Sequence, residues 1–200
     1  MYAYISGILD SKSSNYIIID VNGIGYKIYM SPNAIENMDD IGNKVKVYTH
    51  YHVREDAISL FGFTTNEELR MFELLISVSG VGAKSALTIL ANIEPSSLAL
   101  AVVSNDISKL VKLPGIGAKS AARIILELKD KLKSEQLVIK QHIETEDIVV
   151  NDEKVDEAIS ALQVLGYNRK DIEKIIQKID VRSLNLEEII KLALKYISMN

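Results

Sequence analysis

The chain has 200 residues, of which 48% are hydrophobic and 25% charged, so it has enough apolar material for one or more globular cores. The absence of cysteine and the scatter of three histidines exclude disulfides and thiolate metal sites, and we expect no metal and no cofactor. No apolar run approaches the roughly 20 residues of a membrane span, and the start MYAYISGILD lacks the basic flank of a signal peptide. We therefore expect a cytoplasmic protein with no membrane partner.

The distribution of charge matters more than the net charge of −4, which by itself argues against a nucleic-acid partner. Residues 1–63 carry 5 basic and 7 acidic side chains, residues 64–135 carry 9 and 8, and residues 136–200 carry 9 and 12. The middle segment is thus the only net-positive part of the chain, and any binding of phosphate is expected there.

Residues 1–63 have the pattern of a small β-barrel. Five short runs rich in β-branched and aromatic residues are separated by Ser, Asn, Gly and Asp, namely YAYISGIL, NYIIIDV, GYKIYM, KVKVYTHYHV and AISLFGF. One short helical candidate, PNAIENM after Ser31, lies between the third and fourth runs. This order favours a five-stranded OB-type barrel, although the alternation of residues alone allows another small barrel.

Residues 64–135 change to the helical period. Thr65 and Glu68 form a capping-box signature ahead of LRMFELLISV, which predicts a helix that stops at Ser79-Gly80. Further helices are predicted from Lys84, from about Pro95 to Val103, from Asp106, and from Lys119 to about Leu132. The middle segment is therefore predicted to be all α.

The last part of the chain reads as a linker followed by a helical bundle. Residues 136–152 hold no clean helical stripe and are predicted to be a flexible linker, with docking of their apolar residues as a strand as the alternative. From Glu153 to the end, three segments carry an i, i+3, i+4 apolar stripe, and Asn185 with Glu188 forms another capping signature. We expect a small three-helix bundle at 153–200.

Two stretches of the middle segment repeat one core motif. LISVSGVGAKSALTIL begins at Leu75 and LPGIGAKSAARIILELKDKL at Leu113, and both contain G-[VI]-G-A-K-S-A. The spacing excludes a P-loop, because Ala83 and Ala118 stand where the glycine directly before the lysine is required. The dinucleotide fingerprint also fails, because Ser85 and Ser120 replace its third glycine and helices precede the motif.

Each copy of the motif is therefore predicted to form a helix, a tight turn and a second helix. The glycines permit positive φ and close approach of a ligand, and the start of the second helix offers free N–H groups and a positive dipole end. The alternative is that G-x-G only caps two packed helices; the retention of G-A-K-S in both copies favours a ligand. The residues predicted to contact phosphate are Gly80, Val81, Gly82, Lys84, Ser85, Gly115, Ile116, Gly117, Lys119, Ser120 and Arg123.

Two such hairpins related by a pseudo-twofold axis can hold the two backbones of a duplex across one groove. No side chain is placed to read bases, so binding is expected to depend on the shape of the nucleic acid and on salt. The repeated stretch is thus interpreted as a sugar-phosphate clamp for DNA. Thr88 stands where the second copy has Arg123, so the first hairpin is expected to hold its strand more weakly.

Over essentially its whole length the chain resembles the RuvA family, whose members recognise four-way Holliday junctions. The resemblance rests on V-R-E-D-A at Val53–Ala57, L-F-G-F at Leu60–Phe63, the tandem motifs SGVGAKSA and LPGIGAKSAARIILELKDKL, and AL-x-x-LGY at Ala161–Tyr167. It implies a multidomain α+β protein with an OB-type barrel, a tandem helix-hairpin-helix domain and a UBA-like C-terminal bundle. It also implies binding of junction DNA in recombination and repair, without catalysis.

The same resemblance implies partners and further site residues. It implies a homotetramer formed through the barrels, with one tetramer or two on the junction, and the RuvB hexameric ATPase and the RuvC resolvase as partners. Glu55 and Asp56 become an acidic pin that repels phosphate at the tetramer centre, although acidic residues in a turn are usually ordinary solvated surface. Leu162, Leu165, Gly166 and Tyr167 become the motor-docking site, with core packing as the alternative for the two leucines.

Two functions other than junction binding are compatible with a helix-hairpin-helix motif. A DNA glycosylase also carries a helix-hairpin-helix, and Asp130 or Lys129 could serve it, but both lie on a charged helix face and a glycosylase needs no second hairpin. A general duplex-binding accessory protein is the second alternative. Preference for a four-way junction over linear duplex distinguishes that alternative from a junction-binding protein.

Overall fold

The structure is a computed structural model that describes residues 2–140 and 153–198. The chain separates into two compact units. The first contains the chain up to Ser77 together with Val81–Ile93, and the second contains Val78–Gly80 together with the chain from Glu94 onward. The boundary therefore passes through the turn of the first glycine motif.

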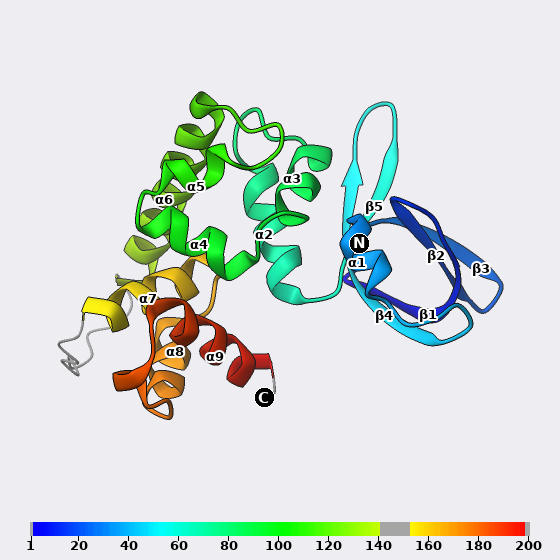
Figure 1. Ribbon diagram of the computed structural model, residues 1–200. Helices are drawn as coiled ribbons and strands as arrows, with labels where there is room; N and C mark the ends of the chain where they lie inside the picture. The colour runs from blue at the N-terminus through cyan, green and yellow to red at the C-terminus, as the bar shows by residue number, and fades with distance from the viewer. Residues whose placement is uncertain (1, 141–152, 199–200) are drawn as a thin grey trace. The chain divides into compact units, whose positions relative to one another are not determined.

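The N-terminal half of the first unit is a closed five-stranded barrel (Figure 1). The strand order around the barrel is β1-β2-β3-β5-β4, in which only β3 and β5 pair in parallel. This order confirms the predicted OB-type barrel. The strands are β1 (Tyr4–Lys12), β2 (Tyr16–Val21), β3 (Ile24–Tyr29), β4 (Lys44–Val53) and β5 (Ile58–Phe63).

The barrel closes around alternate apolar side chains of its strands. Leu9, Ile17, Ile28 and Val47 are fully buried, as the period of two in a strand requires. Gly62 of the L-F-G-F motif lies where a Cβ atom would come within 2.7 Å of Val47 Cγ1. Glycine at this position therefore lets β5 pack closely against the inside of the barrel.

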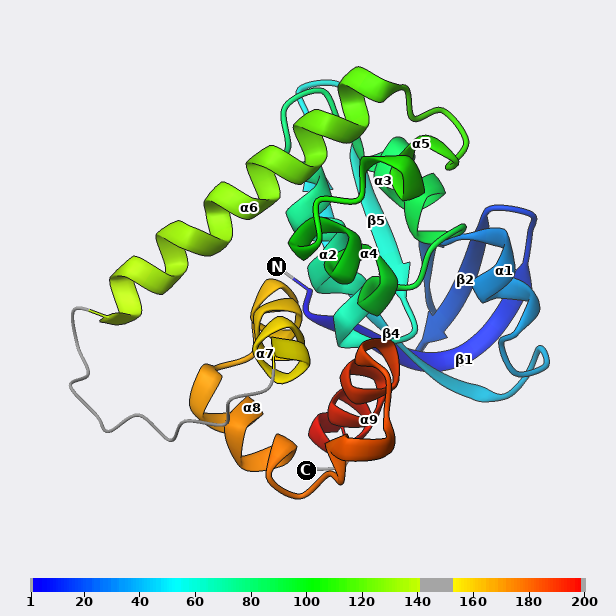
Figure 2. The ribbon, with the colours of Figure 1, turned by 60° about the vertical axis from the view of Figure 1, so that its left-hand side comes forward.

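Three helices complete the first unit. The short α1 (Pro32–Glu36) forms where a short helix was predicted, lies beside β2 (Figure 2) and is capped by the Ser31 side chain. The helix α2 (Asn66–Ile76) begins with the predicted capping box, in which the Thr65 hydroxyl accepts from the Glu68 N–H at 3.2 Å. The helix α3 (Ala83–Leu90) follows the first glycine motif.

Aromatic packing fixes α2 against the barrel. The Phe72 ring lies 4.8 Å from that of Phe63 and 5.3 Å from that of Phe61, measured between ring centroids. The His50 Nδ1 atom on β4 lies 3.0 Å from Glu73 Oε1 at the edge of this contact. Because α2 is the first helix of the first hairpin, these contacts attach that helix to the barrel.

The second unit begins with α4 (Pro95–Val103), α5 (Ile107–Val111) and α6 (Ala118–Lys140). Asp106 caps α5 by accepting from the Lys109 N–H at 3.1 Å. Hydrogen bonds from the Ser108 hydroxyl and the Lys109 amide hold the pKa of the Asp106 carboxyl below its ordinary value. The buried α6 residues Ala121, Ile124, Ile125 and Leu128 form one stripe.

The helix α6 is longer than predicted (Figure 2). It continues beyond Leu132 through Lys140, so residues 136–140 of the predicted linker are helical, and residues 141–152 lie outside the described residues. The prediction ended α6 where its apolar stripe fades. However, the sequence from Lys133 to Lys140 contains neither Gly nor Pro and is rich in strong helix formers, so no residue in it stops the helix.

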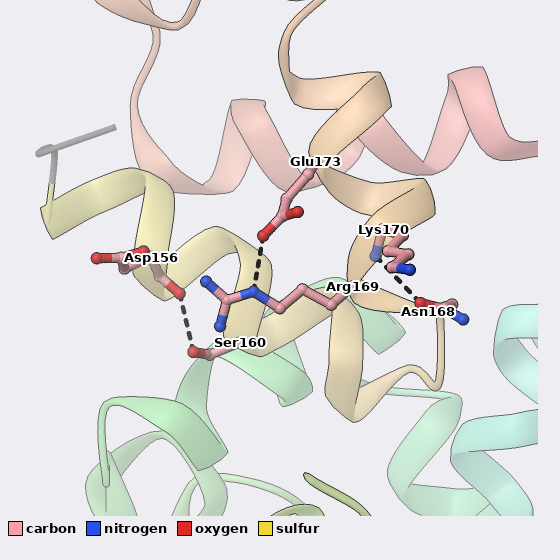
Figure 3. A network of polar contacts seen from close by, with 6 residues as sticks. All are labelled: Asp156, Ser160, Asn168, Arg169, Lys170 and Glu173. Atoms are coloured by element: carbon pink, nitrogen blue, oxygen red, sulfur yellow. Dashed lines mark hydrogen bonds and ion pairs between the residues drawn. The ribbon is translucent and has the colours of Figure 1, made fainter. Parts of the chain in front are cut away.

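The C-terminal bundle consists of α7 (Glu153–Val164), α8 (Arg169–Ile176), a short 3₁₀ turn at Val181–Ser183 and α9 (Leu186–Ser198). Asn168 caps α8 through its side chain, and Arg169 Nε lies 2.7 Å from Glu173 Oε1 one turn later (Figure 3). The predicted capping signature before α9 is present, with the Glu188 N–H donating to Asn185 Oδ1 at 3.0 Å.

The bundle packs against α4 within the second unit. The helices α7 and α9 both contact α4. Lys191 Nζ lies 3.0 Å from Glu94 Oε2, and the Ser97 hydroxyl donates to Glu187 Oε1 at 3.1 Å. The hydrogen bond and charge of Glu94 raise the pKa of Lys191. Polar contacts therefore border the surface between the bundle and α4.

Within 2–140 and 153–198, no single helix has the length and apolar content needed to cross a membrane. The α3 and α4 segments pass that composition test only when taken together as a bent pair.

Candidate nucleic-acid interface

The first glycine motif forms a tight turn between α2 and α3. Gly80 has a φ of +85°, in the left-handed region that favours glycine. Gly82 directly precedes α3 and has a φ of −85° and a ψ of 166°, which other residues adopt freely. The first glycine is thus required by the backbone, as predicted, whereas the second is not.

The N-terminus of α3 carries no side-chain cap. Gly82 has no side chain that could accept from the first amides of the helix, and the Ala86 N–H is the first that bonds back, to the Gly82 carbonyl at 2.9 Å. Lys84 and Ser85 are exposed beside this helix end. Free amides, the positive end of the helix dipole and a lysine together favour an anion.

The second motif repeats this geometry between α5 and α6. Gly115 has a φ of +76°, and the Ala121 N–H donates to the Gly117 carbonyl at 2.9 Å, as Ala86 does in the first copy. Lys119 and Ser120 are exposed in the first turn of α6, which contains no acidic residue. The two copies therefore share the local structure that their sequences predicted.

Ile116 and Val81, two of the residues predicted to contact phosphate, are less accessible to a ligand than the glycines, lysines and serines of the motifs. The Ile116 N–H donates to the Leu113 carbonyl at 3.2 Å, so it closes the turn and is not free for a ligand. The Val81 side chain is buried, so only its backbone can face a phosphate. Both residues hold the turn, because the apolar side chain between the two glycines is partly or wholly covered.

The space beside the second glycine of each motif is open. A Cβ atom built on Gly82 or on Gly117 meets no atom of the protein within 4 Å. Neither the packing of the chain nor, at Gly82, its φ accounts for glycine at these positions. Glycine is a common residue directly before a helix, and it also leaves room for a body outside the chain to approach the backbone closely.

Two side chains of α6 hold the first turn, and the sequence did not indicate either contact. Glu127 Oε2 accepts a hydrogen bond from the Ser79 N–H at 3.0 Å, and Arg123 Nη1 lies 3.5 Å from the Ser79 carbonyl oxygen. The sequence placed Arg123 beside Lys119, where it adds charge to the second motif. The structure directs its guanidinium to the residue before Gly80 in the first motif. A contact between residues so distant in sequence leaves no local pattern to detect.

Glu55 and Asp56 lie in the turn between β4 and β5. The Arg54 N–H donates to the Ala57 carbonyl at 2.9 Å and closes this turn, and all residues from Val53 to Ile58 are exposed. Both carboxylates therefore project from the barrel at the tip of a hairpin, where they are accessible to a partner.

The four residues predicted to dock the motor differ in their burial. Leu162 and Leu165 have no exposed surface, so their side chains pack in the core and do not form a contact surface, as the alternative interpretation held. Gly166 has a φ of +79° and provides a left-handed helix end, with the Tyr167 N–H donating to the Leu162 carbonyl at 3.1 Å. Gly166 and Tyr167 are half-buried.

Three family models together match most of the chain. The RuvA N terminal domain matches residues 1–62, the SAM-like helix-hairpin-helix tandem matches residues 72–130, and the RuvA C-terminal domain matches residues 153–198. The three matches follow the order of the barrel, the two glycine motifs and the C-terminal bundle.

Curated relatives match over nearly the full length. The chain is 48% identical over 199 residues to the Holliday junction branch migration complex subunit RuvA of Acetivibrio thermocellus, with 98% of each chain covered. It is 47% identical to the subunit of the same name from Ruminiclostridium cellulolyticum, covering 98% of this chain and 99% of the relative. The identity to that of Clostridium perfringens strain 13 is 44%, with the same coverage.

Proposed function

The chain belongs to the RuvA family, and from this premise we propose that it binds four-way Holliday junction DNA by shape, without reading base sequence, and takes part in branch migration. The names of its full-length relatives support this function directly. In this proposal the protein holds the junction open during recombination and repair. It catalyses no step itself and acts in the cytoplasm.

One structural observation supports the proposal most strongly. Each glycine motif places a glycine directly before a helix, with an exposed lysine beside the helix start and open space at that glycine, and the start of α3 has no side-chain cap. A phosphate group fits this arrangement because it accepts several hydrogen bonds, carries negative charge and needs close access to the backbone. The same arrangement offers no contact to base edges, which accounts for binding by shape.

The acidic pair extends the proposal to the centre of the junction. Exposed Glu55 and Asp56 repel phosphate and would favour the separated strands of an open crossover over a continuous duplex. In a homotetramer formed through the barrels, four copies of this pair would face the crossover. Either one tetramer or two would then enclose the DNA.

The C-terminal bundle is proposed to bind the RuvB ATPase, and RuvC is proposed as a further partner. Since Leu162 and Leu165 are buried, the docking surface must be formed by exposed bundle residues outside this pair. The half-buried Tyr167 at the left-handed helix end remains a candidate for its edge. The bundle would thereby join the DNA clamp to the motor that moves the DNA.

Competition between DNA forms tests the proposal. We expect an unlabelled four-way junction to displace a labelled junction at a concentration at least about tenfold lower than linear duplex of equal length at moderate salt. The measurement is a gel-shift titration with both competitors. Equal competition by duplex and junction would leave a general duplex-binding protein and reject the junction function.

A further inference from the structure

The two glycine motifs differ at the residue before their first glycine. Ser79 precedes Gly80 in the first copy, whereas Pro114 precedes Gly115 in the second. Proline has a fixed φ and no N–H group, so the second turn is rigid at this residue and has no amide to satisfy. The first turn has neither advantage, and its exposed Ser79 has an N–H group that a side chain can hold through a hydrogen bond.

The helix α6 supplies the acceptor for this N–H group. Glu127 Oε2 accepts from the Ser79 N–H at 3.0 Å, and Arg123, one helical turn earlier on the same face, reaches the Ser79 carbonyl oxygen at 3.5 Å. Ser79 is therefore held at both of its backbone groups by two side chains of one helix. Since Ser79, Gly80 and α6 lie in the same compact unit, these contacts belong to a single packed body.

The contact also places the positive charge of Arg123 where a phosphate could bind. Arg123 Nη1 lies 3.6 Å from the Cβ position of Gly80, so its positive charge stands beside the first turn. A guanidinium has five N–H donors, and only one is directed to Ser79, which leaves others for a phosphate. Thr88 occupies the corresponding position of α3, so the first motif has no arginine of its own.

We propose that Glu127 is a positioning residue for DNA binding, which fixes the Ser79–Gly80 turn so that the Arg123 guanidinium presents its charge to a phosphate beside that turn. The inference rests on the proposed function and adds a residue that holds a phosphate-binding side chain in place. It contradicts simple electrostatics, in which a carboxylate near phosphate weakens binding and its removal strengthens it. The direction of the mutational effect therefore separates the two views.

The test compares five variants of the full chain in junction-binding titrations at fixed salt. We expect Glu127→Ala to weaken binding about fivefold, because the charge-assisted hydrogen bond to the Ser79 amide is lost. Glu127→Gln should stay within about twofold of the unsubstituted chain, since its amide oxygen still accepts that bond. Asp130→Ala removes a nearby exposed carboxylate of the same helix and is the matched control, with unchanged or slightly tighter binding expected.

The last two variants test whether the loss of binding in Glu127→Ala acts through Ser79. In the Ser79→Pro background, which copies the second motif and removes the amide donor, Glu127→Ala should cause no further loss of binding. Thermal unfolding of each variant shows whether the fold persists. If Ser79→Pro alone abolishes binding or unfolds the chain, the comparison of Glu127→Ala with Glu127→Gln still decides.

The inference is overturned if Glu127→Ala leaves binding unchanged, or if it and Glu127→Gln both tighten binding as Asp130→Ala does. Failure of the proposed function gives a different result. In that case the unsubstituted chain itself shows no preference for a junction over duplex, whatever the Glu127 variants do.

Discussion

At Gly82 the backbone adopts angles open to any residue and the space around it is empty, whereas Gly80 needs its positive φ. Alanine should therefore affect mainly the stability of the fold at Gly80 and mainly junction binding at Gly82. We expect Gly80→Ala to lower the free energy of unfolding by about 1–2 kcal/mol, because a side chain is strained in the left-handed region. Gly82→Ala should change it by less than about 1 kcal/mol.

Junction binding should respond differently from stability. We expect Gly82→Ala to weaken it by about 1 kcal/mol, or about fivefold in Kd, because the added methyl group obstructs a phosphate at the helix start. Chemical denaturation and gel-shift titration measure the two quantities. A Gly82→Ala protein that is stable and binds junctions normally would show that nothing approaches this turn closely.

The acidic pair gives a second prediction for single residues. Replacing Glu55 and Asp56 together by lysine should preserve junction binding but raise duplex affinity more, because the charge that disfavours continuous duplex is reversed. The ratio of the two dissociation constants, measured at one salt concentration, is the readout.

The control for the acidic pair is the matched replacement of Asp39 and Asp40, two exposed acidic residues elsewhere on the barrel. If both replacements lower the preference for junctions equally, the effect is general attraction of DNA to added charge, and the proposed role of the pair is wrong.

Residue types and spacing were enough to predict the turns but not the contacts between distant segments. The φ values of Gly80, Gly115 and Gly166 follow from the local need for a residue without a Cβ atom, which a sequence displays. The bond from Ser79 to Glu127 arises from tertiary packing. For the same reason the sequence could not decide between core and surface for Leu162 and Leu165, since an apolar residue at a helix end suits both.

At the scale of elements, all five strands, the capping box of α2 and the three bundle helices were predicted, because alternation, caps and breakers are local signals. The end of α6 was not, because its continuation depends on helix propensity rather than on a buried stripe. The packing of α7 and α9 on α4 was also not predicted, since the apolar stripe of a helix does not specify which element packs against it.

The C-terminal helices give a prediction at this scale. Deleting residues 153–200 should leave junction binding within about threefold, since both glycine motifs remain, and should abolish stimulation of the RuvB ATPase. The deletion should also lower the temperature of unfolding, because α4 loses the helices that cover it. Binding, ATPase rate and thermal unfolding are measured on the same protein, and ATPase stimulation that survives the deletion would refute the docking role of the bundle.

At the scale of the whole molecule, a chain with a small net negative charge is proposed to bind a strongly negative ligand. Its net charge of −4 does not suggest DNA binding, yet its middle segment is net positive and carries two helices that each begin after a glycine, with an exposed lysine in the first turn. In the proposed function, affinity would come from local geometry repeated in the chain, and repetition in a homotetramer would multiply it. The acidic flanks would limit binding to DNA that presents the right shape.

Hydrogen–deuterium exchange with and without a saturating four-way junction tests the central claim most directly, because the claim concerns backbone amides. We predict that the junction slows exchange in peptides covering residues 79–86 and 114–121, and leaves the bundle peptides from 169–198 unchanged. Unchanged exchange at both glycine motifs in the saturated complex would show that these turns do not hold the DNA backbone.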